Sequence, residues 1–541
     1  MKLYFNVFSL AVLCLFSTCL LAQDSTKKWY HLSNFYGGIE SNIQYYVDDN
    51  KTGSIAPVKK MASNTYFNLN YSFKFIEAGI QVENYNPRLQ GYSSQYDSIT
   101  KLVHRFVRFK HKLAQITIGN FYEQFGQGYL FRAYEERQLG IDNIINGVQA
   151  IITPIKQLRV KSFYGKQRNF MTLSPANIFG IDGEYDIANL GKNKNTLITL
   201  GFGYIQKKQT VDIPLPNFPS TINAFGARLK LTNNRYNVTA EYVSKSIEPD
   251  FQNAYIYKKG STFLLTQSYT SPKGWGANIT LRRLENMDFK SNYSSTDAVA
   301  SLNYLPALTK QQSYLVANIY PYNTQWLAEI GGQADYFYYF KKKSTVGGKY
   351  GAKLAINFST YYNLDTARIG NTKNFTSKAI AVGKQKLFSD INISFEKRWT
   401  KTVKSTLTYI HLYYNKPILQ EGSVTAVKAD MVIADVTFKL NSTLSLRTEL
   451  QHLSTKNDNK NWAAALIELN TSKGLSFFAS DLIDYQTNKI NYYNIGAAFN
   501  KNAFRILLNV SRQRAGLICI GGLCRYSPSF TGVNASISYN F

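Results

Sequence analysis

A strict alternation of apolar and polar side chains, which continues to the last residue of the chain, constrains the fold more than any other sequence feature. The final segment places Val533, Ala535, Ile537, Tyr539 and Phe541 on one face and Gly532, Asn534, Ser536, Ser538 and Asn540 on the other. Successive side chains of a β-strand point to opposite faces of its sheet. The pattern therefore predicts a terminal strand with one apolar face and one polar face.

The same alternation recurs upstream in hairpins, where two alternating segments flank a short polar turn. Such turns lie at 232–235, 441–443 and 500–502. In the C-terminal half they alternate with longer connections, which include 246–260, 286–297, 361–386 and 513–530. Short turns on one rim and long loops on the other are typical of outer-membrane barrels. Counting by this rule predicts about 20 to 26 strands, with 26 as the best value, and both chain ends on the periplasmic side.

Composition separates a transmembrane barrel from a soluble β-sandwich. Aromatic residues make up 15% of the chain, with 40 Tyr and 34 Phe, and aromatic rings gather at both membrane interfaces of such barrels. After Gln23 no apolar run is long enough for a spanning helix. A sandwich domain is also much shorter than this chain, which shows no linker. The predicted fold class is all-β: one large single-chain antiparallel transmembrane β-barrel.

The N-terminus predicts a secretory signal, because Lys2 precedes an apolar stretch and Ala22 provides a small residue at a cleavage site. A membrane anchor and lipidation at Cys19 are the alternatives. The residues before Cys19 lack the small side chain that lipid attachment needs. We expect a signal peptide at 1–22, a short periplasmic segment at 23–32 and the barrel at 33–541. The segment 23–32 leaves no room for an N-terminal plug.

The formal net charge of +28 needs an explanation. Nucleic acid is a common partner of a basic chain, but the export signal argues against it. Outer-membrane lipid and lipopolysaccharide headgroups or an anion-attracting lumen fit better, and lysine-rich loops that aid solubility are an alternative. Phe541 resembles the aromatic C-terminal signal that barrels present to their insertion machinery. The expected partners are therefore membrane lipid, that machinery and other outer-membrane proteins.

One segment, 119–143, breaks the alternation and combines aromatic residues, glycines and charges. Successive strands run alternately toward the two rims, and counting them places this segment at the rim with the long loops. It either folds into the lumen and narrows it or packs over the mouth of the barrel. Inside the lumen, its arginines would pair with its glutamates. The candidate constriction residues are Glu123, Arg132, Glu135, Glu136, Arg137 and Asp142.

Cys519 and Cys524 flank a Gly-Gly turn in Cys-Ile-Gly-Gly-Leu-Cys. In an exported protein this pattern predicts a disulfide across a hairpin. No histidine stands nearby in the sequence to complete a metal site. The same count of alternating strand directions places this hairpin in the last long loop, outside the cell.

Two stretches resemble an uncharacterised family of Bacteroidota outer-membrane β-barrels. The first is the segment 119–143 together with Gly147, Pro154 and Gly165-Lys166-Gln167-Arg168, and the second contains Cys519 to Gly522, Cys524-Arg525 and Pro528. The resemblance implies a barrel in the outer membrane and implies no catalytic residues. Some barrels of this group serve as accessory parts of larger outer-membrane machines, so a docking role enters by analogy.

The sequence shows no phosphate-binding glycine loop, no paired-histidine metal motif and no nucleophile elbow, so we expect neither an enzyme nor a cofactor. The leading hypothesis is porin-like passage of small polar or anionic solutes. The alternative is an accessory or docking subunit of a secretion, assembly or motility complex. Charged residues on the predicted polar faces would line the lumen: Arg228, Lys230, Glu241, Asp390, Glu396, Asp435, Lys439, Arg447, Glu449 and Arg505.

Overall fold

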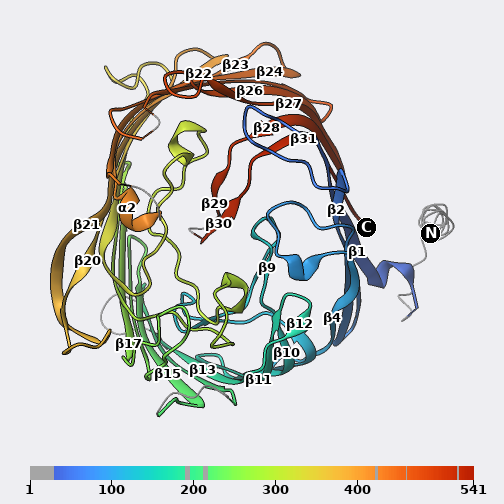
Figure 1. Ribbon diagram of the computed structural model, residues 1–541, viewed down its shortest axis with the longest axis vertical. Helices are drawn as coiled ribbons and strands as arrows, with labels where there is room; N and C mark the ends of the chain where they lie inside the picture. The colour runs from blue at the N-terminus through green and yellow to red at the C-terminus, as the bar shows by residue number, and fades with distance from the viewer. Residues whose placement is uncertain (1–29, 189–194, 211–216, 421–423, 459, 521–522) are drawn as a thin grey trace.

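The computed structural model describes residues 30–188, 195–210, 217–420, 424–458, 460–520 and 523–541. In these residues 24 antiparallel strands are joined edge to edge, and the last pairs with the first to close a barrel (Figure 1). The first half of the barrel consists of β1 (Phe35–Tyr46), β2 (Met61–Phe73), β3 (Ile76–Tyr85), β4 (Ile99–Lys110), β5 (Ala114–Phe121), β10 (Ile145–Ile155), β11 (Leu158–Asn169), β13 (Asn177–Ala188), β14 (Leu197–Lys208), β15 (Thr221–Thr232), β16 (Tyr236–Lys245) and β17 (Gly260–Thr270). The second half consists of β18 (Trp275–Glu285), β19 (Ala328–Phe340), β20 (Ala352–Arg368), β21 (Phe375–Arg398), β22 (Val403–Tyr414), β23 (Val427–Lys439), β24 (Leu444–Thr455), β25 (Trp462–Thr471), β26 (Leu475–Asp484), β27 (Ile490–Lys501), β28 (Phe504–Gln513) and β31 (Phe530–Asn540).

The predicted all-β barrel is confirmed, and its strand number lies within the predicted range but below the best value of 26. Two loop boundaries were wrong. The connection expected at 286–297 continues to residue 327, and the described chain there contains no strand. The loop expected at 361–386 is mostly strand, because β20 and β21 run through it and leave only 369–374 as the turn. The predicted signal peptide, 1–22, lies outside the described residues.

Side-chain alternation sorts each strand into an outer face and a lumen face. On β15, Phe225 and Leu229 are exposed on the outside while Arg228 is buried on the inside. Outer aromatic side chains near the short turns include Tyr236, Tyr269 and Trp275, which form successive ring contacts at 4.6 and 4.9 Å. An apolar outer belt edged by aromatic rings is what a transmembrane barrel presents to lipid.

No helix among the described residues is both long and apolar enough to cross a membrane.

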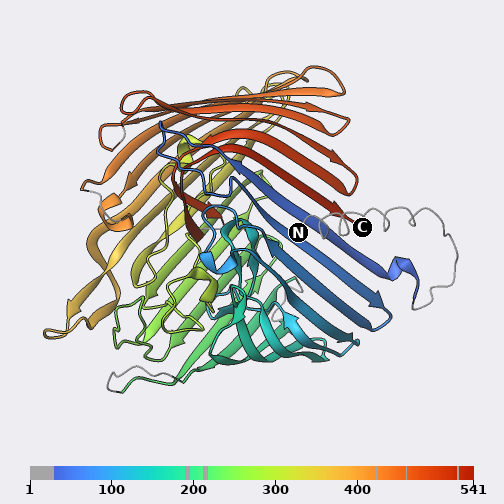
Figure 2. The same cartoon turned by 45° about the vertical axis from the view of Figure 1, so that its right-hand side comes forward.

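Three of the segments that fold into the lumen bond one another, and together we call them the plug: 122–144, 286–327 and the hairpin of 516–520 and 523–527 (Figures 1 and 2). The short elements of the chain are β6 (Gln124–Phe125), β7 (Phe131–Arg132), β8 (Glu135–Glu136), β9 (Ile141–Asp142), β12 (Thr172–Leu173), β29 (Gly516–Ile520), β30 (Leu523–Ser527), η1 (Leu32–Asn34), η2 (Ser94–Tyr96), η3 (Arg137–Leu139), η4 (Ala298–Ala300), η5 (Val316–Asn318) and α2 (Lys416–Leu419). The main buried apolar clusters lie between the plug and the wall. The hydrophobic core of this barrel is therefore inside its lumen.

Candidate functional site: the lumen and its plug

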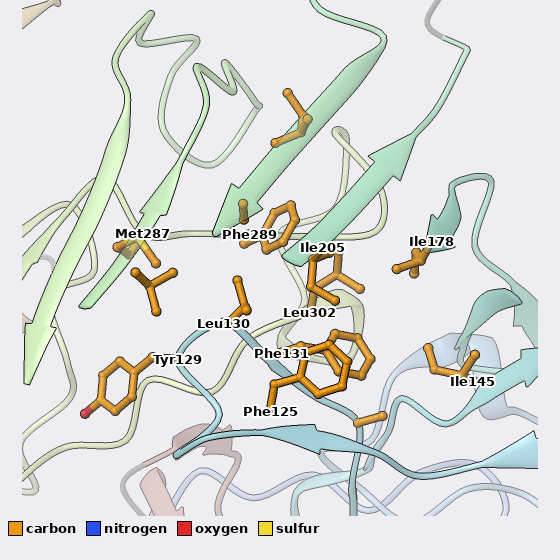
Figure 3. Close-up of a cluster of buried hydrophobic side chains, with 14 of the residues drawn as sticks. Phe125, Tyr129, Leu130, Phe131, Ile145, Ile178, Ile205, Met287, Phe289 and Leu302 are labelled. Carbon is orange, nitrogen blue, oxygen red and sulfur yellow. The ribbon is translucent and has the colours of Figure 1, made fainter. Parts of the chain in front are cut away.

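The first plug segment, 122–144, is fixed to the wall by aromatic packing. The rings of Phe125 and Phe131 lie 5.7 and 4.7 Å from that of Phe163 on β11, and all three side chains are buried. Figure 3 shows these two plug rings beside Leu130 and beside Leu302 of the second segment. A wall strand needs only one apolar face, whereas a segment inside the core must present apolar side chains in several directions. The non-alternating sequence of this segment provides them.

Gly126 brings the plug backbone against two charged wall residues. Its φ of +53° is in the left-handed region, and a Cβ there would lie 2.3 Å from Cδ of Arg228 and 2.8 Å from the carboxylate oxygens of Glu241. The next residue, Gln127, donates its backbone N–H to Glu241 at 3.0 Å. Arg228 is held by Asp182 at 2.8 Å. Only glycine combines this backbone conformation with so close an approach.

A second attachment is a buried charge cluster around Arg168, near the end of β11 on the side of the long loops. The guanidinium bonds Glu83 at 2.6 Å and also bonds Asp142 of the plug, which lies 2.6 Å from Nε2 of His104. Burial alone would raise the pKa of Asp142, but Arg168 and His104 lower it to about 2. The plug carboxylate is therefore ionised and clamped between two wall strands.

Glu83, His104 and Asp142 are close enough to suggest a metal site. Arg168 lies among them, with one terminal nitrogen 3.0 Å from Glu83 and 3.3 Å from His104. A metal ion would have to displace that guanidinium and then share the cluster with its charge. The arrangement fits an internal salt bridge and does not fit a metal centre.

The other candidate charges of the first segment bind mainly to the wall. Glu123 pairs with Lys161 at 2.7 Å, and Arg137 pairs with Glu40 of β1 as well as with Glu135, both at 2.8 Å. The predicted pairing within the segment therefore holds for Arg137 and Glu135 only. Arg132 stacks instead on the ring of Tyr304, 4.0 Å from its centre. The carboxylate of Glu136 accepts the backbone N–H of Gln138 at 3.4 Å.

The second plug segment, 286–327, was missed beyond residue 297. It crosses the lumen and bonds both the first segment and distant wall strands. Tyr304 N donates to Gly128 O at 2.9 Å, Tyr361 of β20 donates to Leu308 O at 2.7 Å, and Val316 N donates to Gln451 of β24 at 3.1 Å. A signal for it exists in the sequence, because lumen-facing positions of β22 and β23 near the long loops are apolar. These are Ile410, Leu412, Val427, Ala429, Met431 and Ile433.

The third plug segment is the hairpin of β29 and β30, closed by the predicted disulfide between Cys519 and Cys524. The hairpin lies in the last long loop, between β28 and β31, as predicted, but this loop folds into the lumen and does not stand outside the barrel (Figure 1). Ile518, Ile520 and Leu523 pack on a buried cluster of wall and plug residues. Arg525 donates to Gln138 O at 3.1 Å, which joins the hairpin to the first segment.

The predicted wall residues lie in two environments. Toward the plug, Arg228, Glu241, Asp390 and Glu449 are buried. Arg447 pairs with Asp435 at 2.9 Å and with Glu449, and Glu396 pairs with Lys404 at 3.0 Å. Toward the short turns, Lys230, Lys439 and Arg505 are exposed. The ion pairs found among the described residues do not include these three cations.

A row of uncharged amides, which sequence reasoning did not single out, crosses the lumen face of four neighbouring wall strands. Four lumen-facing amides follow one another on β27, β28, β31 and β1, and we call them the amide track: Asn494, Asn509, Asn534 and Gln44. Asn509 donates to Asn494 at 2.7 Å and Gln44 donates to Asn534 at 2.9 Å. Among the described residues, the side-chain hydrogen bonds of the track stay within the wall and its immediate neighbours.

These features define a class of protein: a closed antiparallel barrel with an apolar outer belt, whose own loops fill part of its lumen. The chain belongs to a family of unknown function (DUF6029), whose profile matches residues 4–541. The expected membership of an uncharacterised family is thereby confirmed, and an origin in Bacteroidota stays a prediction. No curated protein sequence matches the chain.

Several solved barrels are similar to the chain at low sequence identity. The siderophore receptor PirA from Pseudomonas aeruginosa is 9% identical, with 96% of this chain and 81% of that chain covered and a TM-score of 0.43. The P pilus usher (PapC) translocation pore is 9% identical over 94% of this chain and 99% of that chain, with a TM-score of 0.40. Acinetobacter baumannii OccAB3 is 8% identical over 94% of this chain and 99% of that chain, with a TM-score of 0.37.

Proposed function

We propose that the protein is a non-enzymatic outer-membrane barrel that passes small polar solutes along the amide track, beside a fixed plug. The amide track is the observation that supports this most directly. Amide groups offer both donors and acceptors without charge, so they replace the water around a hydroxylated or amide-bearing solute with little electrostatic barrier. Among the described residues, the plug hydrogen-bonds wall amides such as Gln451 and Gln167 but none of the four track amides, and this leaves the track as the polar route.

The proposal includes the orientation and export of the chain. The signal at 1–22 would direct secretion, the short turns would face the periplasm and the long loops the exterior. The C-terminal residue, Phe541, is exposed and exchanges backbone hydrogen bonds of 3.0 Å with Gly37 on β1. The insertion machinery would meet this ring before β1 and β31 close the barrel.

The alternative is a closed barrel that serves as a docking subunit, and the way the plug is held favours it. Three segments bond one another and the wall through buried contacts, so no single loop is free to open as a gate. Such a barrel could support partners at its long-loop rim without passing solutes.

Planar-bilayer recordings of the full chain and of a variant lacking 124–138 distinguish the two functions. For the channel we expect a small steady conductance, a higher conductance in the deletion variant, and uptake of neutral sugars by liposomes. Asn509→Leu should lower sugar uptake, because it removes hydrogen-bonding groups from the track. The control Asn278→Leu alters a lumen-facing amide of β18, outside the track, and should leave sugar uptake unchanged. A silent barrel in both forms, isolated from native membranes with a stoichiometric partner, would establish the docking function instead.

A further inference from the structure

One cavity of the described chain lies on the outer face of the barrel. It has a volume of about 1040 Å³ and lies between the wall strands β17 to β20 and the upper part of β21. Phe263, Ile279, Leu281 and Phe358 line it from the wall, and Ile380 and Val382 line it from β21. We call this cavity the lateral groove.

The groove exists because the β20–β21 hairpin leaves the barrel surface. These strands, 352–368 and 375–398, extend beyond their neighbours, and their pairing shifts register after Tyr361, Tyr362 and Leu364. Bulges bend and twist a strand pair. The part of the hairpin beyond Tyr362 therefore stands outside the ring of strands, as the ribbons of β20 and β21 show in Figure 1.

Polar contacts hold the hairpin at the end that lies on the side of the long loops, and the groove lies between these contacts and the apolar belt. Arg283 of β18 donates to Ser377 at 2.9 Å, and Ser377 donates to Glu285 at 2.5 Å. Lys258 pairs with Glu285 at 3.0 Å, and Asn374 accepts the backbone N–H of Tyr257 at 2.7 Å. The hairpin is thus fastened to β18 and to the loop before β17, with apolar side chains facing each other beneath the fastening.

The outer face of β18 changes character along this groove. Ile279 and Leu281 are exposed and apolar, whereas Arg283 and Glu285 on the same face are charged and bonded. At about 3.3 Å per residue, the stretch from Ile279 to Glu285 spans about 20 Å of the wall. The groove therefore begins in the apolar belt and ends at a charged edge, on the side of the long loops.

We infer that the lateral groove binds the acyl chain of an anionic membrane lipid. A cavity this large and apolar gains stability when apolar material fills it, and at the level of the belt that material is lipid chain. At the upper end, Lys258 and Arg283 share one carboxylate, Glu285, which leaves a net positive charge for an anionic headgroup. The inference rests on the proposed membrane location.

Native mass spectrometry of the detergent-solubilised full chain tests it, with phosphatidylglycerol and phosphatidylcholine added in equal amounts. We expect wild type to retain phosphatidylglycerol in preference to phosphatidylcholine. Ala334→Trp, which fills the groove from β19, should lower retention about tenfold. The control Ala434→Trp changes an outer-face alanine of β23 away from the groove and should retain the lipid. Arg283→Gln should reduce the preference for the anionic lipid.

Equal retention by the Ala334→Trp and Ala434→Trp variants would overturn the inference. Heat-modifiable migration and insertion into liposomes check that each variant folds. If wild type inserts but retains no lipid, the groove inference fails and the membrane location stands. If wild type does not insert at all, the proposed membrane location fails first.

Discussion

Arg168 links the plug to the wall through two carboxylates, Glu83 and Asp142, and all three side chains are buried. Arg168→Met would leave both carboxylates without their cation, and breaking a buried pair in this way costs about 3–5 kcal/mol. We expect the first plug segment to detach while the barrel stays folded. Hydrogen exchange of 122–144 would show this as faster exchange there than in β22–β28.

The exposed pair of Glu396 and Lys404 provides the control for Arg168→Met. Glu396→Gln removes a lumen charge that is partly solvated, and such pairs contribute about 0–1 kcal/mol. We expect the backbone amides of 122–144 in the Glu396→Gln variant to exchange hydrogen at the same rate as in wild type. Equal exchange in all three proteins would show that the Arg168 cluster does not hold the plug.

The same cluster predicts how the plug responds to acid. Burial raises the pKa of Asp142, but Arg168 and His104 outweigh it and lower the value to about 2, against about 3.9 for an unfolded aspartate. A depressed carboxyl pKa stabilises the folded state above the unfolded value, and this contribution is lost as the pH falls through about 2. Pepsin cleavage within 122–144 should therefore rise between about pH 4 and pH 2. Release that is complete above about pH 5 would contradict the assignment.

At the scale of elements, the disulfide hairpin is expected to act locally. Cys519 and Cys524 close a short loop, and short loops gain at most a few kcal/mol from closure. The hairpin also packs by Ile518, Ile520 and Leu523. The double variant Cys519→Ser, Cys524→Ser should raise protease sensitivity at 516–527 and leave heat-modifiable migration of the barrel unchanged. Loss of that migration would mean that the hairpin supports the whole barrel.

The elements differ in how far their sequence determines them. The hairpin around 232–235 could be predicted, because a strand pair needs only a local period and a turn. The inward fold of 122–144 could be suggested from its broken alternation, but its partners could not, because Asp142 binds Arg168 and His104 from strands that meet only in the closed barrel. The segment 298–327 was missed, since it has no regular period. Its place is fixed by contacts such as that of Val316 with Gln451, far along the chain.

For the whole molecule, the uneven charge of the lumen predicts ion selectivity. Near the short turns Lys230, Lys439 and Arg505 are exposed, whereas the charges nearer the plug are largely paired. Open cations at one mouth of a pore attract anions, and this attraction weakens with salt. We expect wild type to prefer anions in a potassium chloride gradient, more strongly at about 0.1 M than at about 1 M salt.

Replacing all three cations with glutamate should move the reversal potential toward cation preference, because each change reverses a charge that ions pass. Lys428→Glu is the matched control: Lys428 is exposed on the outer face of β23, so it changes the net charge of the protein without changing the lumen. It should leave the reversal potential unchanged. If the triple variant conducts with wild-type selectivity, ions do not pass these three residues. The route through the barrel would then lie elsewhere in the lumen.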